Sequence, residues 1–342
     1  MKRRFDTKDD AVRWGCNDAA NPLGILPEGN LLLAGKSKVN NMRSRGLGNL
    51  SRLSDTLFLE FLGWLSPITI VILSRCSKAL LAFTRHEPLW KDIYLRAANG
   101  SLPAWHGNWR KTYACIFGGS SPSSLYIAND SKGERVNSKG FYSDVLYQPI
   151  LCANLDPRSY FYLHSSRKKA RENIRRQSAT DLAVEDFVSL YAATSTPVII
   201  TDAMGSWPSY SSQCWSPQKL LAMYGDQLFR AEAVDCSLAT YLTYANNCPQ
   251  DESPLYLFDS HFVEKTGGKM ESEYAVPEYF SEDLFRYMSD ERPNYRWLVC
   301  FPCQLPTTPR VTMCLYCIRS SVRPGLGPHS IRIQIRPQRG MQ

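Results

Sequence analysis

The sequence has no long uninterrupted run of apolar residues. Its longest apolar stretch, residues 57–73, is broken by a glutamate, a glycine, a serine and a proline, so it falls short of the roughly 20 continuous residues that cross a bilayer. The N-terminus carries three basic residues with no apolar segment behind them. We therefore expect neither a membrane anchor nor a secretory signal. In the reducing compartment that this implies, the eleven cysteines are expected to be buried thiols rather than disulfides.

Acidic residues are absent from the C-terminal region. From Pro293 onward the chain has no Asp, Glu or Lys but seven arginines, so this region carries nearly all of the net charge of +8. The remainder of the chain is close to neutral. A broad phosphate-binding surface on the folded part, and hence nucleic-acid binding, is not expected.

Histidine is scarce, and no histidine has a carboxylate two residues further on. The five histidines are His86, His106, His164, His261 and His329. A facial triad of two histidines and one carboxylate, which holds Fe(II) while leaving positions open, cannot take its His-x-Asp or His-x-Glu form here. No catalytic residue of this kind is predicted.

The length allows about two domains of roughly 150 residues each. Residues 1–48, rich in Asn, Gly, Ser and charge, are expected to be disordered. The regions that follow are a helical region (49–117), a linker with an extended arm and a basic run (118–180), a second folded region (181–299) and a divergent tail that contains Arg, Pro and Cys (300–342).

The helical region opens with an amphipathic pattern. Leu53, Leu57, Phe61, Leu62 and Leu65 recur at spacings of three and four, which is typical of a helix that packs on one face.

A second helix should follow at once. Asp55 suits the start of the first helix, and Ser66-Pro67 suits the start of the second, because proline is tolerated in the first turn. The apolar series of the second helix, which includes Ile68 and Ile72, is expected to pack back on the first.

The spacing of five leucines, Leu53, Leu57, Leu59, Leu62 and Leu65, resembles that of an F-box. The resemblance also draws on Arg75-Cys76-Ser77, on Leu89-Trp90 and on the word PAWHGNWRKTY at 103–113, which is similar to a segment after the F-box in jumonji relatives. Ser54 stands where family members usually have proline. The resemblance implies docking on the Skp-type adaptor of a cullin-RING ubiquitin ligase through Leu53, Leu57, Phe61, Leu62, Leu65 and Pro67. An ordinary helical hairpin with core leucines is the alternative.

The linker holds two further patterns. Residues 141–152 are rich in aromatic and β-branched side chains and are predicted to form a strand pair or an extended arm. The basic run at 167–176 fits either a nuclear-localisation or nucleic-acid patch or a solvated helix face.

Helical and strand patterns alternate through the second folded region. The predicted elements are a helix at 181–191, a strand at 197–201, a helix at 215–226, a strand at 227–234, a helix at 236–247 and a strand at 254–259. The words YAVPEYFSEDLF (274–285) and ERPNYRWLV (291–299) follow.

This series resembles the N-terminal half of a jumonji-C oxygenase domain of the phosphatidylserine-receptor-like group. The resemblance implies an α+β chain, in which a small helical F-box bundle precedes an incomplete double-stranded β-helix of cupin-like fold. For complete relatives it implies Fe(II) and 2-oxoglutarate as cofactors. It also implies Lys or Arg side chains of nuclear proteins, histones included, as substrates, and a nuclear or nucleocytoplasmic location.

The residues after Val299 depart from this family. Its His-x-Asp would fall about ten residues later, where Arg310-Val311-Thr312 stand. His261 has no carboxylate companion at a usable spacing and is predicted to be structural. No bound cofactor is therefore expected for this chain.

Two interpretations of the tail remain. The pairs Cys300-x-x-Cys303 and Cys314-x-x-Cys317 suit a four-cysteine zinc site, although the ten residues between them are fewer than usual. Alternatively the tail is foreign sequence from a splicing or frame error, and the jumonji-C region is truncated before its metal-binding motif.

Two functions follow from these patterns. The first is an F-box adaptor with a partial jumonji-C region that lacks the facial triad and has no oxygenase activity. The second is an Fe(II)/2-oxoglutarate-dependent protein hydroxylase or histone demethylase of the jumonji-C family, whose catalytic half is missing from this chain.

Overall fold

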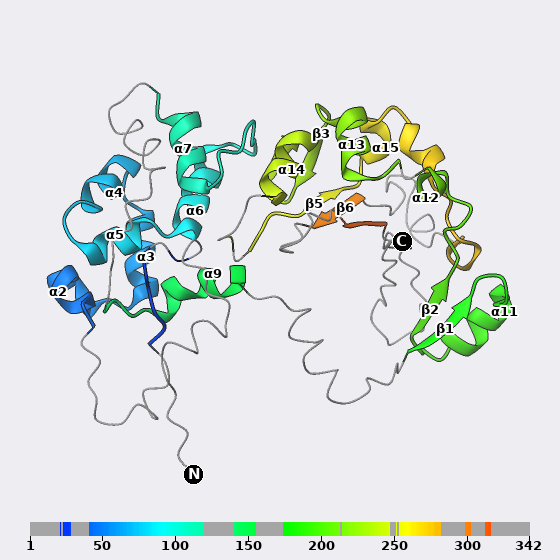
Figure 1. Ribbon diagram of the computed structural model, residues 1–342, viewed down its shortest axis with the longest axis horizontal. Helices are drawn as coiled ribbons and strands as arrows, with labels where there is room; N and C mark the ends of the chain where they lie inside the picture. The colour runs from blue at the N-terminus through cyan, green and yellow to red at the C-terminus, as the bar shows by residue number, and fades with distance from the viewer. Residues whose placement is uncertain are drawn as a thin grey trace, which may run out of the picture. The chain divides into compact units, whose positions relative to one another are not determined.

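The computed structural model forms two compact units (Figure 1). The first comprises residues 1–156 and 247–254, and the second comprises residues 157–246 and 255–342. Within them the structure describes residues 21, 23–28, 41–119, 140–154, 174–212, 214–246, 251, 253–281, 298–301 and 312–315.

Helices make up most of the first unit as described. In chain order they are α2 (Arg43–Leu47), the 3-10 turn η1 (Gly48–Arg52), α3 (Asp55–Gly63), α4 (Pro67–Leu73), α5 (Lys78–Thr84), α6 (Glu87–Ala97), α7 (Trp109–Phe117) and α9 (Asp144–Asn154). Ser54 and Ser66 cap α3 and α4, each accepting a hydrogen bond from the backbone N–H three residues on. The predicted helix starts at Asp55 and Pro67 are confirmed.

The core of this unit is largely aromatic. Phe58 of α3 meets Phe83 of α5 edge to face, with ring centroids 4.8 Å apart. Ile70 of α4 is buried, whereas Ile68 and Ile72 are exposed. The predicted packing of these two residues on the first helix is therefore wrong. A short helix composed almost wholly of apolar residues cannot bury every side of its surface, and α4 buries the side that carries Ile70.

The segment predicted to be an extended arm is a helix. Ser143 caps α9, since its Oγ accepts a hydrogen bond from the backbone N–H of Leu146 and lies 2.5 Å from Asp55 Oδ2. Phe141, just before it, contacts Phe83 of the core. These capping and tertiary contacts outweigh the strand propensity of the aromatic and β-branched residues.

Part of the N-terminal region predicted to be disordered is ordered. Residues 43–47 form α2, and Leu26 pairs with Tyr142 in a parallel bridge. Arg43 forms an ion pair with Asp55, with its Nε 2.6 Å from Oδ1. The first unit therefore draws on chain from both sides of the predicted helical region.

The second unit combines strands and short helices. Its elements are β1 (Arg175–Ser178), α11 (Val184–Phe187), the π-helical turn η2 (Val188–Ala192), β2 (Val198–Thr201), α12 (Pro208–Ser211), α13 (Pro217–Tyr224), β3 (Leu228–Ala231), β4 (Val234–Ser237), α14 (Leu238–Asn246), β5 (Leu257–Asp259), α15 (Phe262–Lys265), η3 (Lys269–Glu273), η4 (Glu278–Phe280), β6 (Leu298–Phe301) and β7 (Thr312–Leu315). The helices predicted at 181–191 and 215–226 and the strands predicted at 197–201 and 254–259 are confirmed in type, with bounds that differ by a few residues. The strand predicted at 227–234 is the first arm of a hairpin, β3 with β4, that the pattern did not predict. The helix predicted at 236–247 starts later, at Leu238, because Cys236 and Ser237 belong to β4.

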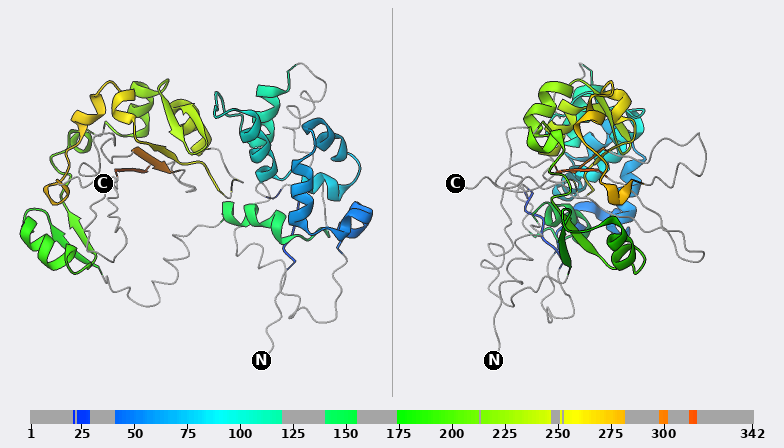
Figure 2. Two further views of the ribbon diagram at one scale, coloured as in Figure 1. Left: turned by 180° about the vertical axis from the view of Figure 1, so that it is seen from behind. Right: turned by 90° about the vertical axis from the view of Figure 1, so that its right-hand side faces the viewer.

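The strands form two sheets. β1 and β2 pair in parallel, and a five-stranded antiparallel sheet has the order β4-β3-β5-β6-β7. Helices α14 and α15 pack against β3, and in the left view of Figure 2 the yellow-green and yellow helices lie above the orange strand β6. Arg175 and Arg176, the end of the basic run, lie in β1, so the alternative of a helix face is wrong for these two residues. The strand β7 lies in the region predicted to be a divergent tail.

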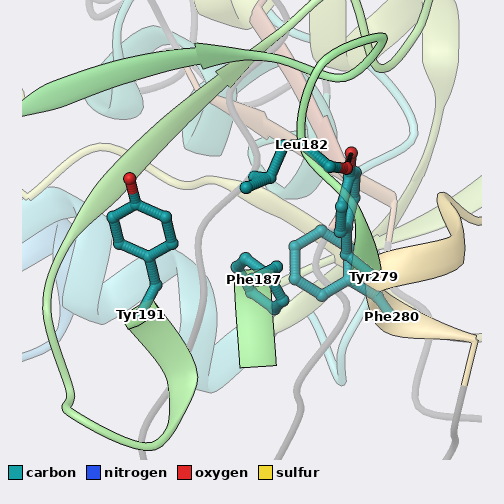
Figure 3. Packing of buried hydrophobic residues seen from close by; sticks show 5 residues of the cluster. All are labelled: Leu182, Phe187, Tyr191, Tyr279 and Phe280. Carbon is teal, nitrogen blue, oxygen red and sulfur yellow. Dashed lines mark hydrogen bonds between the residues drawn. The ribbon is translucent and has the colours of Figure 1, made fainter. Parts of the chain in front are cut away.

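A small hydrophobic core connects the parallel pair β1–β2 to the segment of chain that follows β5 (Figure 3). Leu182, Phe187, Tyr191, Tyr279 and Phe280 form it. The Tyr279 hydroxyl donates to the backbone oxygens of Leu182 at 2.6 Å and Ala179 at 3.1 Å. The aromatic pair of η4 thus closes the β-α-β unit made by β1, α11 and β2.

Several predicted features lie outside the described residues, among them positions 1–20, the linker at 120–139, most of the basic run and most of the tail. Within the described part the chain is α+β, with helices and small sheets. None of its described helices combines the length and the apolar character needed to cross a membrane.

Candidate functional site

The end of β5 holds a buried carboxylate, Asp259, that accepts several hydrogen bonds. Asp259 is buried, and its Oδ2 accepts hydrogen bonds from the backbone N–H of Arg230 at 2.8 Å and from Lys265 Nζ at 2.6 Å. Its Oδ1 accepts the backbone N–H of His261 at 2.8 Å. Both oxygens are therefore engaged in holding β3, β5 and α15 together.

His261 contributes its backbone rather than its ring to this arrangement. Its N–H donates to Asp259, and its carbonyl accepts the N–H of Lys265 in the first turn of α15. The imidazole is exposed, with Nδ1 3.1 Å from Ser260 Oγ. These contacts suit a turn that redirects the chain after β5.

The other histidines lie apart from this place. His86 precedes α6 in the first unit, and burial lowers its pKa to about 4. His106 lies between α6 and α7, where its backbone N–H donates to Thr112 Oγ1. His164 and His329 are outside the described residues.

These residues do not fit an Fe(II) site. Among the residues described, no three His, Cys, Asp or Glu side chains are grouped so that they could hold a metal ion. Thr312, at the predicted position of the family's second ligand, begins β7 opposite Phe301, while Arg310 and Val311 are not described. Threonine and arginine are poor ligands for Fe(II).

The alternative zinc site falls largely outside the described residues. Cys303 and Cys317 are not described. In the β6–β7 register Cys300 stands opposite Met313 and Cys314 opposite Val299, so the two described cysteines are not cross-strand partners. The four-cysteine site stays a prediction.

The described thiols differ in exposure. Cys76 and Cys115 are exposed, which makes the prediction of buried thiols wrong for these two, and Cys236 is buried in β4. Burial raises the pKa of the Cys236 thiol to about 12. This cysteine therefore lacks the thiolate character that a nucleophile needs.

An exposed apolar row runs along α3 and α4. Large side chains that remain accessible to solvent are Leu57, Phe61, Trp64, Ile68 and Ile72. Trp64 is the most exposed, at 84%. Single exposed apolar residues are ordinary, but several on two consecutive helices are typical of an interaction surface.

The structure divides the residues predicted to bind a partner. Leu57 and Phe61 belong to the exposed row, whereas Leu62 is completely buried and belongs to the core. Leu53, Leu65 and Pro67 are partly buried. Sequence reasoning missed Trp64, and the helix pattern that places Leu62 inward could have indicated that a residue two positions on points outward.

Comparisons with known proteins gave no matching family model but several curated relatives. The "Arginine-specific demethylase JMJ22" of Arabidopsis thaliana is 35% identical over 285 residues, which are 82% of this chain and 51% of that protein. The "Lysine-specific demethylase JMJ21" of the same plant is 29% identical over 266 residues, 76% of this chain and 26% of that protein.

A shorter match joins the chain to an animal protein. The "Bifunctional arginine demethylase and lysyl-hydroxylase psr-1" of Caenorhabditis elegans is 35% identical over 145 residues, 40% of this chain and 36% of that protein. The chain spans about half the length of the first curated relative and less of the others. Because the match to the first relative is longer than the second unit, it extends into the helical unit. The chain is thus similar over most of its length to jumonji-type demethylases, and this similarity supports the jumonji-C region and the cupin-like fold expected from its sequence.

Proposed function

We propose that this chain is part of a jumonji-C protein demethylase or hydroxylase that acts on Arg or Lys side chains of proteins. The similarity to an arginine-specific demethylase, which extends across both units, carries the proposal. The antiparallel sheet supports it, because β6 adds the strand at which the family's metal-binding segment would follow. Histone or other nuclear protein substrates, with a nuclear or nucleocytoplasmic location, belong to the same proposal.

Fe(II) and 2-oxoglutarate would be the cofactors of such an enzyme. The described residues offer no donor set for the metal, and no histidine of the chain has the His-x-Asp or His-x-Glu form. The role proposed for the residues described is therefore to form the scaffold that precedes the metal-binding segment. We place the ligands outside the described residues, in a segment that would follow β6 in the order of the family.

The test begins with the nucleotide sequence downstream of the Val299 codon, read in all three frames. We expect a His-x-Asp followed by a Thr-Ser-Ala-Trp-Asn-like word. A protein that continues in that frame should convert 2-oxoglutarate to succinate in the presence of added Fe(II) and a methylarginine peptide. The chain as given, assayed in parallel, should give no turnover. Turnover by the chain as given, or no such word in any frame, would contradict the proposal.

We propose a second function, adaptor binding, on the basis of the exposed apolar row of α3 and α4. A partner with an apolar groove, such as the Skp-type adaptor of a cullin-RING ubiquitin ligase, would cover these side chains. The row includes two of the residues predicted for this contact, Leu57 and Phe61. Docking through them would bury apolar surface that is otherwise in water.

Co-purification with the adaptor tests this second proposal. The variant Leu57→Glu with Trp64→Glu should lose binding. The matched control is Leu190→Glu with Leu221→Glu, which alters two exposed leucines of the second unit and should bind normally. If the variant of the exposed row binds the adaptor as well as the control variant does, the adaptor proposal is wrong, and the demethylase proposal is unaffected.

A further inference from the structure

The helical unit contains a short piece of chain from a distant part of the sequence. Residues 247–254 follow α14 and precede β5, yet they belong to the first unit. Of these, Asp251, Ser253 and Pro254 are described, and we call these three residues the strap. Asp251 is buried although it is charged.

The Asp251 carboxylate is held by α6 and α7. Lys91 Nζ lies 3.2 Å from each carboxylate oxygen, and the indole Nε1 of Trp109 donates to Oδ2 at 2.9 Å. The backbone N–H of Ser253 donates to Oδ1. The side chains of Lys91 and Asp251 are only 11% and 5% exposed, so this is a buried ion pair rather than a surface contact.

The strap in turn supplies the hydrogen-bond acceptors of Lys91. Its ammonium donates to the carboxylate of Asp251 and to the backbone oxygen of Ser253. It also lies 5.7 Å from the centroid of the Trp109 ring. Without the strap, a buried ammonium and a buried indole N–H on the helices would lose acceptors, and such losses are costly in the protein interior.

The first residues of α6 and α7 complete the cluster. Trp109 begins α7, and its backbone N–H donates to Glu87 Oε2 at 2.7 Å, while Glu87 begins α6. The two helix starts and the strap therefore meet at Trp109, whose backbone N–H binds Glu87 and whose indole N–H binds Asp251. Trp109 is fully buried there and contacts Trp105 edge to face.

We propose that the strap is a closing element of the helical unit, so that α6 and α7 reach their stable packing only when Asp251 is inserted between Lys91 and Trp109. The helical unit is then not an independent module. Its stability is coupled to a segment that lies between α14 and β5 in the chain. Removing one charge of the Lys91–Asp251 ion pair loosens the packing of α6 on α7. This coupling requires neither of the functions proposed above.

Hydrogen exchange of the full-length chain tests the proposal. Asp251→Asn keeps the shape of the side chain and an acceptor for Trp109 but leaves Lys91 buried without a counter-charge. We expect amides of α6 and α7 to exchange roughly tenfold faster or more. Amides of α13, β3 and β4 should keep their protection. The matched control is Asp235→Asn, which removes the partner of Arg230 in an exposed ion pair and should change neither set.

Two further variants distinguish a coupled pair from independent effects. Lys91→Arg keeps the charge and should retain protection of α6 and α7 to within about threefold. Lys91→Met should open these helices as Asp251→Asn does. Combining Lys91→Met with Asp251→Asn should cost less than the sum of the two single effects, because no unpaired charge remains. Unchanged exchange in Asp251→Asn, additive single effects or equal loss of protection in the second unit would overturn the proposal.

Discussion

The carboxylate of Asp259 on β5 accepts a hydrogen bond from the backbone N–H of Arg230 on β3 at 2.8 Å. This side-chain hydrogen bond adds to the backbone pairing of the two strands, which is registered at one residue pair. β3 and β5 are registered at Ala231 and Leu257, and Asp259 lies two residues beyond Leu257 on β5. Hydrogen bonds to an ionised carboxylate are stronger than those between neutral groups. The attachment of β3 and β4 to β5 and the rest of the sheet therefore depends on Asp259.

We therefore expect Asp259→Ala to lower the free energy of unfolding of the second unit by about 2–4 kcal/mol, since it leaves the N–H groups and Lys265 without their acceptor. Urea denaturation followed by circular dichroism measures this loss. The matched variant Asp235→Ala, at an exposed ion pair, should cost less than about 1 kcal/mol. His261→Ala should also be mild, because its backbone makes the contact with Asp259. A larger loss for His261→Ala than for Asp259→Ala would show that the imidazole has a role that these contacts do not explain.

The start of α6 gives the helical unit a dependence on pH. Burial of the carboxyl is the main cause that raises the pKa of Glu87 to about 7; the hydrogen bond from Trp109 and the charge of Arg110 oppose this shift, and the negative charge of Asp251 adds to it. Between the ordinary value of 4.5 and about 7, the folded state keeps a proton that the unfolded state has lost. Stability from this residue is therefore fully present below pH 4.5 and is lost as the pH rises to about 7.

Comparison with Glu87→Gln isolates this effect. The unfolding free energy of the native chain minus that of the variant should fall by up to about 3 kcal/mol between pH 4.5 and pH 7. The opposite contribution from His86, whose pKa burial lowers to about 4, is present in both proteins and cancels. Urea titrations at intervals of half a pH unit measure the difference. A difference that rises over this range would mean that the carboxylate, not the acid, is the favoured buried form.

The sequence pattern predicts the helix starts of the first unit well because their causes are local. Ser54 and Ser66 cap helices through their own hydroxyls, and Pro67 fits a first turn. The alternation of β3 is equally local, since Phe229 and Ala231 face inward and their neighbours do not. Such signals need no knowledge of the rest of the chain.

Other features depend on partners far away in the sequence. The helix α9 is capped by Ser143, which also contacts Asp55, and Asp251 is bound by Lys91 across 160 positions. No window of neighbouring residues contains both members of either pair. The candidate metal site is a different case, because the absence of His-x-Asp is legible in the sequence itself. The exposed row on α3 and α4 is predicted in part. The sequence shows the apolar stripe, but packing against the other helices decides which of its residues point outward.

The two sides of α3 predict opposite outcomes for similar substitutions. Leu62 is fully buried, so Leu62→Glu should cost more than about 4 kcal/mol or prevent folding of the helical unit, because a charge would enter an apolar core. Trp64→Glu, on the exposed side, should change stability by less than about 1 kcal/mol. Thermal unfolding of the two variants separates these outcomes. Comparable destabilisation by both would mean that Trp64 is covered in solution, for example by a second copy of the chain, and dilution would then lower the melting temperature of the native protein.

The hydroxyl of Tyr279 offers a test of the small core in the second unit. Tyr279→Phe keeps the ring, which lies 5.2 Å from that of Phe187, but removes the donor shared by the backbone oxygens of Leu182 and Ala179. We expect a loss of about 1–3 kcal/mol, since the buried carbonyl of Leu182 would lose a partner. Hydrogen exchange should show the loss first in β1 and β2, with β3 and β4 unaffected. Tyr210→Phe, at an exposed tyrosine, is the control and should be neutral. If Tyr279→Phe is also neutral, ring packing alone closes the β-α-β unit, and Tyr279→Leu should then cost more than the loss of the hydroxyl.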